Sequence, residues 1–280
     1  MTADAILPLA PVTPLEAERR QALLEALLGV ARRAGTEIMR VYESDFAVRG
    51  KADDSPVTEA DERAERVILA HLAALAPDIP AVSEEACSKD GLPPPTARFW
   101  LVDPLDGTRE FVKRNGEFTV NIALIENGAP VLGVVYIPAL DDLYFGGEGL
   151  GAYRENGREY PLKDGGARHA IHARRPPAEG LIALASASHG DEAALQAFLA
   201  KDGRKVAGIQ RCGSSLKLCR IAAGEADLYP RLGRTMEWDI AAGHAVLRAA
   251  GGRVRTLDGS ELGYGKPGYE NPHFVASGAA

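Results

Sequence analysis

Near the N-terminus, apolar and charged positions follow the period of a helix. Within residues 24–38, charged side chains such as Glu25 and Arg32 fall outside a line of apolar ones. This spacing gathers the apolar side chains on one face, so it predicts an amphipathic helix over residues 16–41. The apolar face comprises Leu24, Leu27, Leu28, Ala31 and Ile38.

A second helix is predicted to begin after Thr58. The Thr58 hydroxyl can cap the helix, and Asp61, three residues on, completes a variant of the capping box. The residues that follow again place their apolar side chains on one stripe, which we expect to be buried. This stripe comprises Ala64, Val67, Ile68, Leu72 and Leu75.

Beyond Pro77 the pattern changes to short apolar runs that are typical of strands. Two runs, residues 79–82 and 99–102, each lead into an acidic residue, and we expect the segment between them to be a stiff surface loop because it contains three consecutive prolines. A strand meander is predicted next. Its turn is Asn127-Gly128, because both positions of such a turn require positive φ. The meander strands are residues 119–125, 131–137 and 143–145.

The second half of the chain alternates predicted strands with predicted helices. Residues 240–250 are apolar nearly all round, which indicates a buried helix that ends at Gly251-Gly252. We therefore expect an α+β domain over residues 1–155 and an α/β domain over residues 156–280. The remaining predicted elements are strands at 181–185 and 226–229 and helices at 192–199 and 216–223.

Composition narrows the class of protein. The net charge of −7 argues against a nucleic-acid polymer as partner, but a small phosphorylated ligand needs only a few local cations. No apolar run approaches the roughly 18 residues of a transmembrane segment, and residues 1–15 lack the basic and apolar regions of a signal peptide. The cysteines, Cys87, Cys212 and Cys219, are an odd, sparse set, so we expect idle thiols in a reducing cytoplasm.

Acidic residues follow the predicted strands and open the buried helix. Glu84 follows one strand, Asp103 and Asp106 follow another, and Asp239 precedes the helix. Ligands gather at such strand ends and helix starts. Clustered carboxylates repel one another unless cations neutralise them, and a site with only oxygen donors favours Mg²⁺ over Zn²⁺.

Simpler interpretations exist for single acids. Asp239 can be a helix cap, and Asp103 can start a turn before proline. They do not explain the run of residues 103–108 as a unit, in which Pro104 fixes the chain and the amides of Gly107 and Thr108 can hold a phosphate. The haloacid dehalogenase motif D-x-D-G-T is rejected, because the two acids here are three residues apart.

Four segments together resemble the motifs of the inositol monophosphatase-like superfamily, in the order that the family has them. Residues 99–124 are more similar still to one branch, the bacterial 3′(2′),5′-bisphosphate nucleotidases of sulfur assimilation. The resemblance implies a layered αβαβα sandwich. The four segments are PVTEAD at 56–61, SEE at 83–85, WLVDPLDGT at 100–108 and WDIAAGHAVLRAAGG at 238–252.

The resemblance also implies a catalytic site with two Mg²⁺ ions. Glu84, Asp103 and the carbonyl of Leu105 would hold the first ion. Asp103, Asp106 and Asp239 would hold the second. A water on the first ion would be the nucleophile, and Thr108 would help to accept its proton. In several relatives an aspartate near the PVT-type segment pairs with the motif threonine or with a third, weaker metal ion, and Asp54, with Asp53 adjacent, is the candidate here.

The substrate side is implied by the nucleotidase branch. Ser214, Lys217 and Arg231 would hold the second phosphate of a nucleotide, and His189 would lie near the nucleoside. Asp239 would also face the substrate. Solvated surface cations remain the alternative for Lys217 and Arg231, as does a surface position for His189.

The resemblance therefore predicts a cytoplasmic Mg²⁺ phosphatase. Its expected substrate is adenosine 3′,5′-bisphosphate, which would give AMP, and relatives suggest a homodimer. Inositol monophosphate or another small phosphate ester is the alternative substrate. A non-catalytic ligand sensor on the same fold is the alternative from another class, and metal-dependent phosphate release would separate it from an enzyme.

Overall fold

Two long helices cover one face of a large sheet. The computed structural model describes residues 10–50, 56–156, 168–187 and 192–279. Helix α1 spans Ala17–Tyr42 and helix α2 spans Glu59–Leu75, as the apolar stripes predicted. Thr58 caps α2: its hydroxyl accepts the N–H of Ala60, and its own N–H donates to the Asp61 carboxylate at 2.8 Å. The capping box is therefore confirmed.

The large sheet has seven strands, in the order β3-β4-β5-β6-β7-β8-β9. Strands β3 and β4 are parallel, and every later pair is antiparallel, so the predicted meander is confirmed. The Asn127-Gly128 turn has positive φ at both positions. The strands are β3 Ala81–Ser83, β4 Arg98–Asp106, β5 Thr119–Glu126, β6 Ala129–Ile137, β7 Asp142–Gly147, β8 Gly151–Asn156 and β9 Arg168–Ala170.

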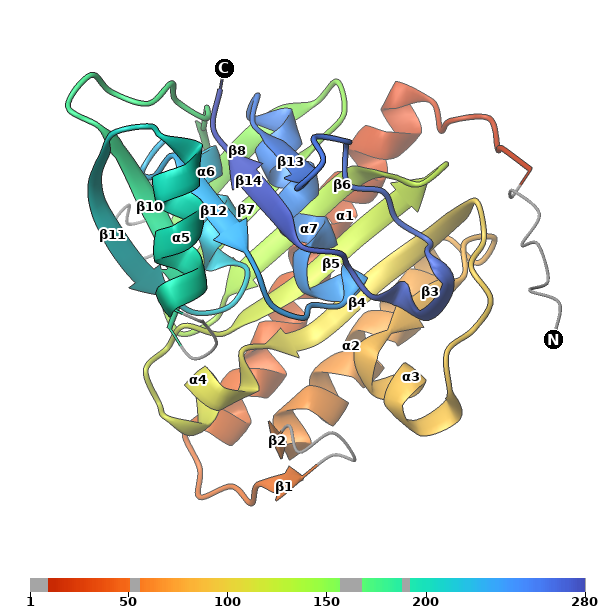
Figure 1. The fold of residues 1–280 in the computed structure, drawn as a ribbon. Helices are drawn as coiled ribbons and strands as arrows, with labels where there is room; N and C mark the ends of the chain where they lie inside the picture. The colour runs from red at the N-terminus through yellow and green to blue at the C-terminus, as the bar shows by residue number, and fades with distance from the viewer. Residues whose placement is uncertain (1–9, 51–55, 157–167, 188–191, 280) are drawn as a thin grey trace, which may run out of the picture.

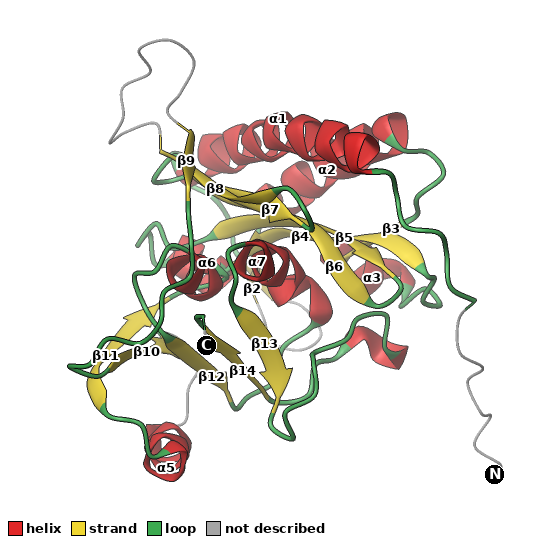
Figure 2. Cartoon of the chain, turned by 90° about the horizontal axis from the view of Figure 1, so that it is seen from above, coloured by secondary structure: helices red, strands yellow, loops and turns green. Residues whose placement is uncertain are grey.

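A smaller sheet has five strands, in the order β11-β10-β12-β14-β13. Between the two sheets lie helix α6, Leu216–Ala222, and helix α7, Glu237–Ala249, as Figure 2 shows from above. Helix α5, Glu192–Asp202, covers the outer face of the smaller sheet. Its strands are β10 Leu181–Ser186, β11 Val206–Cys212, β12 Leu228–Arg231, β13 Arg253–Thr256 and β14 Phe274–Ser277.

The five layers of helix, sheet, helix, sheet and helix confirm the expected αβαβα sandwich (Figures 1 and 2). Helix α7 lies directly on the large sheet, and this close approach requires a glycine. A Cβ on Gly133 of β6 would lie 2.2 Å from the carbonyl oxygen of Ala242. No helix in the described parts of the chain has the length and apolar character needed to cross a bilayer.

The structure differs from the sequence expectations at α3 and at the start of α7. The segment after β3 was expected to be a loop, but its first turns form helix α3, Glu84–Asp90. The buried helix begins at Glu237, so Asp239 lies inside its first turn and does not precede it. The large sheet continues to Ala170, although the division into domains at residue 155 stays a prediction. Smaller elements are β1 Arg49–Gly50, β2 Pro56–Val57, α4 Thr108–Val112 and the 3₁₀ turn Pro267–Tyr269.

Candidate active site

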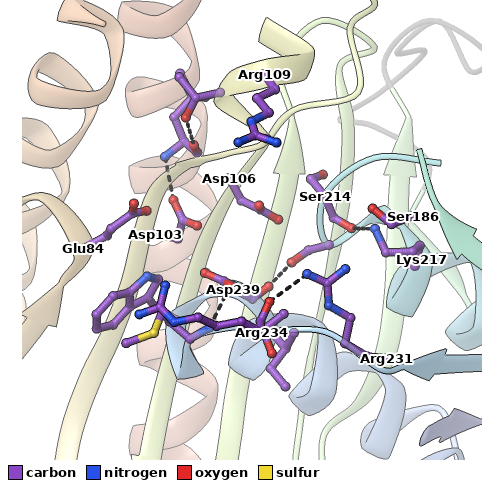
Figure 3. A pocket seen from close by; sticks show the side chains of 18 of the residues that line it. Glu84, Asp103, Asp106, Arg109, Ser186, Ser214, Lys217, Arg231, Arg234 and Asp239 are labelled. Carbon is purple, nitrogen blue, oxygen red and sulfur yellow. Dashed lines mark hydrogen bonds between the residues drawn. The ribbon is translucent and has the colours of Figure 1, made fainter. Parts of the chain in front are cut away.

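One pocket of about 540 Å³ collects every expected site residue that the structure describes. In Figure 3 the acids lie to the left and centre, whereas Ser214, Lys217 and Arg231 lie to the right. Asp54 and His189 lie outside the described residues. The expected residues that line the pocket are Glu84, Asp103, Leu105, Asp106, Gly107, Thr108, Ser214, Lys217, Arg231 and Asp239.

An irregularity at the end of β4 presents two of the acids. Asp103 pairs with Asn121 and Asp106 pairs with Thr119, so β4 has one residue more than β5 between these pairs. Such a bulge bends a strand and redirects its side chains, often beside an active site. The side chain of Asp103 turns back to accept the N–H of Leu105 at 3.0 Å, which fixes the bend.

Asp239 is held by the start of α7. Its Oδ2 accepts the N–H of Met236 at 2.8 Å, the bond that an acid makes in a capping box. The bond fixes the rotamer of the side chain, which lines the pocket. The capping interpretation and the ligand interpretation of Asp239 are therefore compatible.

The acids repel one another. Burial raises the pKa of Asp106 to about 6, where Lys217 opposes the rise and Glu84 and Glu110 add to it. Burial, Asp106 and Glu84 hold the pKa of Asp239 well above its usual range. Burial is the larger cause of both shifts and the neighbouring carboxylates add to it, so a cation in the pocket would favour the ionised forms.

The donors suit a hard cation. Carboxylate and carbonyl oxygens are the ligands that Mg²⁺ prefers, and the pocket wall offers both. Across the described part of the chain, no three His, Cys, Asp or Glu side chains are close enough to form a ready-made metal cluster. The acids therefore converge on the pocket without closing on one point, and their oxygen chemistry and shared charge are what fit Mg²⁺.

Thr108 contacts Asp61, whereas the resemblance offered Asp54 as the aspartate that pairs with the motif threonine. Its hydroxyl lies 3.3 Å from Oδ1 of Asp61 and 3.3 Å from the carbonyl oxygen of Leu105. Asp61 is fully buried, and its Oδ2 accepts the N–H and the hydroxyl of Thr58 at 2.8 and 2.9 Å. Asp61 belongs to the segment PVTEAD, which carries part of the resemblance, but we interpreted it only as part of the capping box.

The opposite wall of the pocket is cationic. The Lys217 ammonium is buried and donates to the carbonyl oxygens of Ser214 and Cys212 at 2.6 and 3.3 Å. Ser214 has φ +40°, and its buried hydroxyl has no hydrogen-bond partner among the described residues. Arg231 donates to the carbonyl oxygen of Arg234 at 2.8 Å. The structure therefore presents a lysine, an arginine and a hydroxyl beside the acids.

Further residues of the pocket wall were missed. Arg109 and Arg234 are exposed at its rim, and Ser186 lies beside Lys217 (Figure 3). Arg109 directly follows Thr108, so its position in the motif was a usable signal. Arg234 lies five residues before Asp239, so its position was also a usable signal, whereas Ser186 is distant in sequence from the site acids and only the fold brings it here.

A buried polar network joins the two walls. Asn121 Nδ2 donates to Ser215 Oγ at 2.9 Å and lies 3.4 Å from the carbonyl oxygen of Asp239. Asn121 Oδ1 accepts the hydroxyl of Thr119 at 3.0 Å. Ser215 Oγ donates to the same Asp239 carbonyl. Helix α7, and Asp239 with it, is thereby fixed to β5 and to the start of α6.

Replacing Asn121 with alanine is expected to lower the free energy of unfolding by about 1–3 kcal/mol, because the buried Thr119 hydroxyl loses its acceptor and Ser215 loses one donor. Urea denaturation measures the change. Gln196→Ala, on the exposed face of α5, is the control and should change stability by no more than about 0.5 kcal/mol. Equal stabilities for the two variants would mean that the network contributes nothing.

The layered sandwich and its acidic pocket define a family. The model of the inositol monophosphatase family matches residues 19–278, and the chain belongs to this family. The expected family membership is confirmed. The three cysteines are free and buried, as expected of idle thiols.

Individual relatives point to one branch. The chain is 46% identical over 260 residues to a protein of Shigella flexneri named 3′(2′),5′-bisphosphate nucleotidase CysQ, which covers 91% of this chain and 99% of that protein. The structure resembles CysQ of Bacteroides thetaiotaomicron, with a TM-score of 0.74 and 37% identity over 93% of this chain and 98% of that one. It also resembles an IMPase of Thermotoga maritima, with a TM-score of 0.73 and 27% identity over 91% and 92% of the two chains.

Proposed function

We propose that the protein is a Mg²⁺-dependent phosphatase that removes the 3′-phosphate of adenosine 3′,5′-bisphosphate and releases AMP. The observation that carries the proposal is the division of one pocket into an acidic wall and a cationic wall. A phosphate monoester needs only the acidic wall. The cationic wall suits a second phosphate that does not react, and the names of the relatives support this assignment.

The acidic wall would hold the metal ions. Glu84, Asp103, Asp106 and Asp239 are the proposed ligands, together with the carbonyl oxygen of Leu105. When bound, Mg²⁺ would supply an activated water and stabilise the charge on the leaving oxygen. The acids also repel free phosphate, so substrate binding depends on their neutralisation.

Thr108 and Asp61 would together accept the proton of the nucleophilic water. Because the Thr108 hydroxyl can donate to Asp61, at 3.3 Å, its lone pairs are left to accept a proton from the pocket. The buried carboxylate of Asp61 can in turn accept the proton that the Thr108 hydroxyl donates. Asp61 is fixed by the backbone of Thr58, so the pair is held in place before the substrate arrives.

The cationic wall would bind the 5′-phosphate. An ammonium has three N–H donors, and Lys217 uses two of them on backbone carbonyls. The third donor, the hydroxyl of Ser214 and the guanidinium of Arg231 can all meet a phosphate. The expected phosphate contacts of the Gly107 and Thr108 amides, and the homodimer, stay predictions.

A phosphate-release panel tests the proposal. It compares adenosine 3′,5′-bisphosphate, inositol 1-phosphate, fructose 1,6-bisphosphate and histidinol phosphate, each with Mg²⁺ and with EDTA. We expect release that depends on Mg²⁺ and the highest kcat/KM for the adenosine bisphosphate. Preference for inositol 1-phosphate would support the alternative substrate, and no release from any ester would support a ligand sensor.

Removing one cation should weaken binding of the bisphosphate selectively. Lys217→Met and Arg231→Ala are each expected to raise KM for adenosine 3′,5′-bisphosphate by roughly 10- to 150-fold, the range for a hydrogen bond to a charged group. The 5′-phosphate does not react, so KM should change more than kcat. Initial rates on 3′-AMP, which has no 5′-phosphate, are the control. Equal losses on both nucleotides would contradict the assignment of this wall.

A further inference from the structure

The loop that carries Ser214 is fixed at both ends by hydrogen bonds to other segments of the chain. Residues 213–215 connect β11 to α6. At the far end of the loop, Ser215 Oγ donates to the carbonyl oxygen of Asp239. Ser214 itself stands between these anchors in a left-handed conformation, with φ +40°, that only firm restraints maintain in a serine.

The other anchor is Glu117, in the segment between α4 and β5. Its Oε2 accepts the N–H of Gly213 at 2.8 Å, across 96 residues of chain. The N–H of Glu117 in turn donates to Oδ1 of Asn115 at 2.9 Å, which fixes its backbone. Glu117 does not line the pocket. Any effect it has on the reaction must therefore pass through the loop.

The backbone of Glu117 also lies close to both walls. A Cβ on Gly213 would lie 2.8 Å from the carbonyl oxygen of Glu117, and a Cβ on Gly107 would lie 3.2 Å from the same atom. Gly107 directly follows Asp106, and Gly213 directly precedes Ser214. One carbonyl group therefore lies beside both the metal-ligand segment and the proposed phosphate loop. The two also approach each other directly, since a Cβ on Gly107 would lie 3.2 Å from the Cβ of Ser214.

We infer that Glu117 is a positioning residue that sets the distance between the reacting phosphate and the second phosphate. The inference rests on the proposed function. Its side chain holds the loop and its carbonyl lies against both segments, so the pocket accepts two phosphates at one separation. The substrate class this selects is a compact nucleoside bisphosphate.

The test compares Glu117→Ala with Glu117→Gln on two substrates. Alanine removes the acceptor of the Gly213 N–H, and we expect KM for adenosine 3′,5′-bisphosphate to rise about tenfold. The kcat/KM for 3′-AMP should stay within about threefold of the parent, because that substrate does not use the loop. Glutamine keeps an acceptor oxygen, so it should restore most of the affinity.

A double variant separates positioning from general damage. If Glu117 acts through the loop, Glu117→Ala should add little to the loss already caused by Lys217→Met. Additive losses, equal losses on both substrates, or identical Ala and Gln variants would each overturn the inference. Thermal unfolding of every variant is measured in parallel, and an Ala variant that loses rate only because it unfolds also overturns it. A parent enzyme without preference for the bisphosphate would instead overturn the proposed function.

Discussion

Replacing Asp106 with asparagine is expected to lower kcat at least ~100-fold, on the scale of losing one dominant electrostatic contribution to a transition state. Asparagine has nearly the same shape but removes one charge from the crowded wall. Burial, Glu84 and Glu110 raise the pKa of Asp106, which means that its ionised form is disfavoured in the folded protein. The variant should therefore be at least as stable as the parent. Phosphate release gives the rate, and urea denaturation gives the stability.

The control for this prediction is Asp90→Asn, an exposed acid at the end of α3. It removes the same charge outside the pocket and should leave kcat unchanged. Titration calorimetry with Mg²⁺ should show weaker binding for Asp106→Asn alone. An Asp106→Asn enzyme within threefold of the parent would contradict the assignment of Asp106 as a ligand.

Thr108→Ala is expected to reduce kcat by roughly 10²–10⁴, the usual contribution of general acid–base catalysis. The substitution removes the hydroxyl that lies between the pocket and Asp61. Thr108→Ser restores the hydroxyl and should recover much of the rate. Single-turnover phosphate release measures the chemical step apart from product release.

Asp61 gives an independent check of the same pair. Asp61→Asn keeps an oxygen for the N–H of Thr58, so α2 should remain capped while the proton acceptor is lost. We expect its rate to fall with that of Thr108→Ala. Alanine and serine at residue 108 that behave alike would show that the hydroxyl takes no part in the chemistry.

The regular elements could be predicted where many apolar residues share one period. The stripe of α1 and the meander of the large sheet are of this kind. Helix α3 could not, because its sequence EEACSKD has one buried apolar residue, Cys87, and no repeating period. Strands β13 and β14 are four residues each, so their sequences are too short to show a strand pattern, and the strands are recognisable only from their pairing in the structure.

The site could be predicted where its residues lie within the motifs that the resemblance covers, even though these motifs are far apart along the chain. Asp103, Asp106 and Thr108 lie within one motif, and their pocket was foreseen. Asp61 was assigned to a helix cap because its neighbour Thr58 is close along the chain. The sequence does not show that the end of β4 brings Thr108 to the second carboxylate oxygen of Asp61. The contact of Glu117 with Gly213 is likewise created by the fold alone.

Two of the acids discussed here, Asp61 and Asp239, also secure the start of a helix through a backbone N–H. A relative that has lost catalytic activity would still need both acids for stability, since loss of a helix cap costs about 0.5–2 kcal/mol. Thr108 accepts no backbone N–H among the described residues, and its contact with the Leu105 carbonyl is long, at 3.3 Å, so its loss should cost less stability. In a diverged relative, the presence of the two acids therefore does not by itself indicate that the relative is still an active enzyme. The residue aligned with Thr108 is more informative.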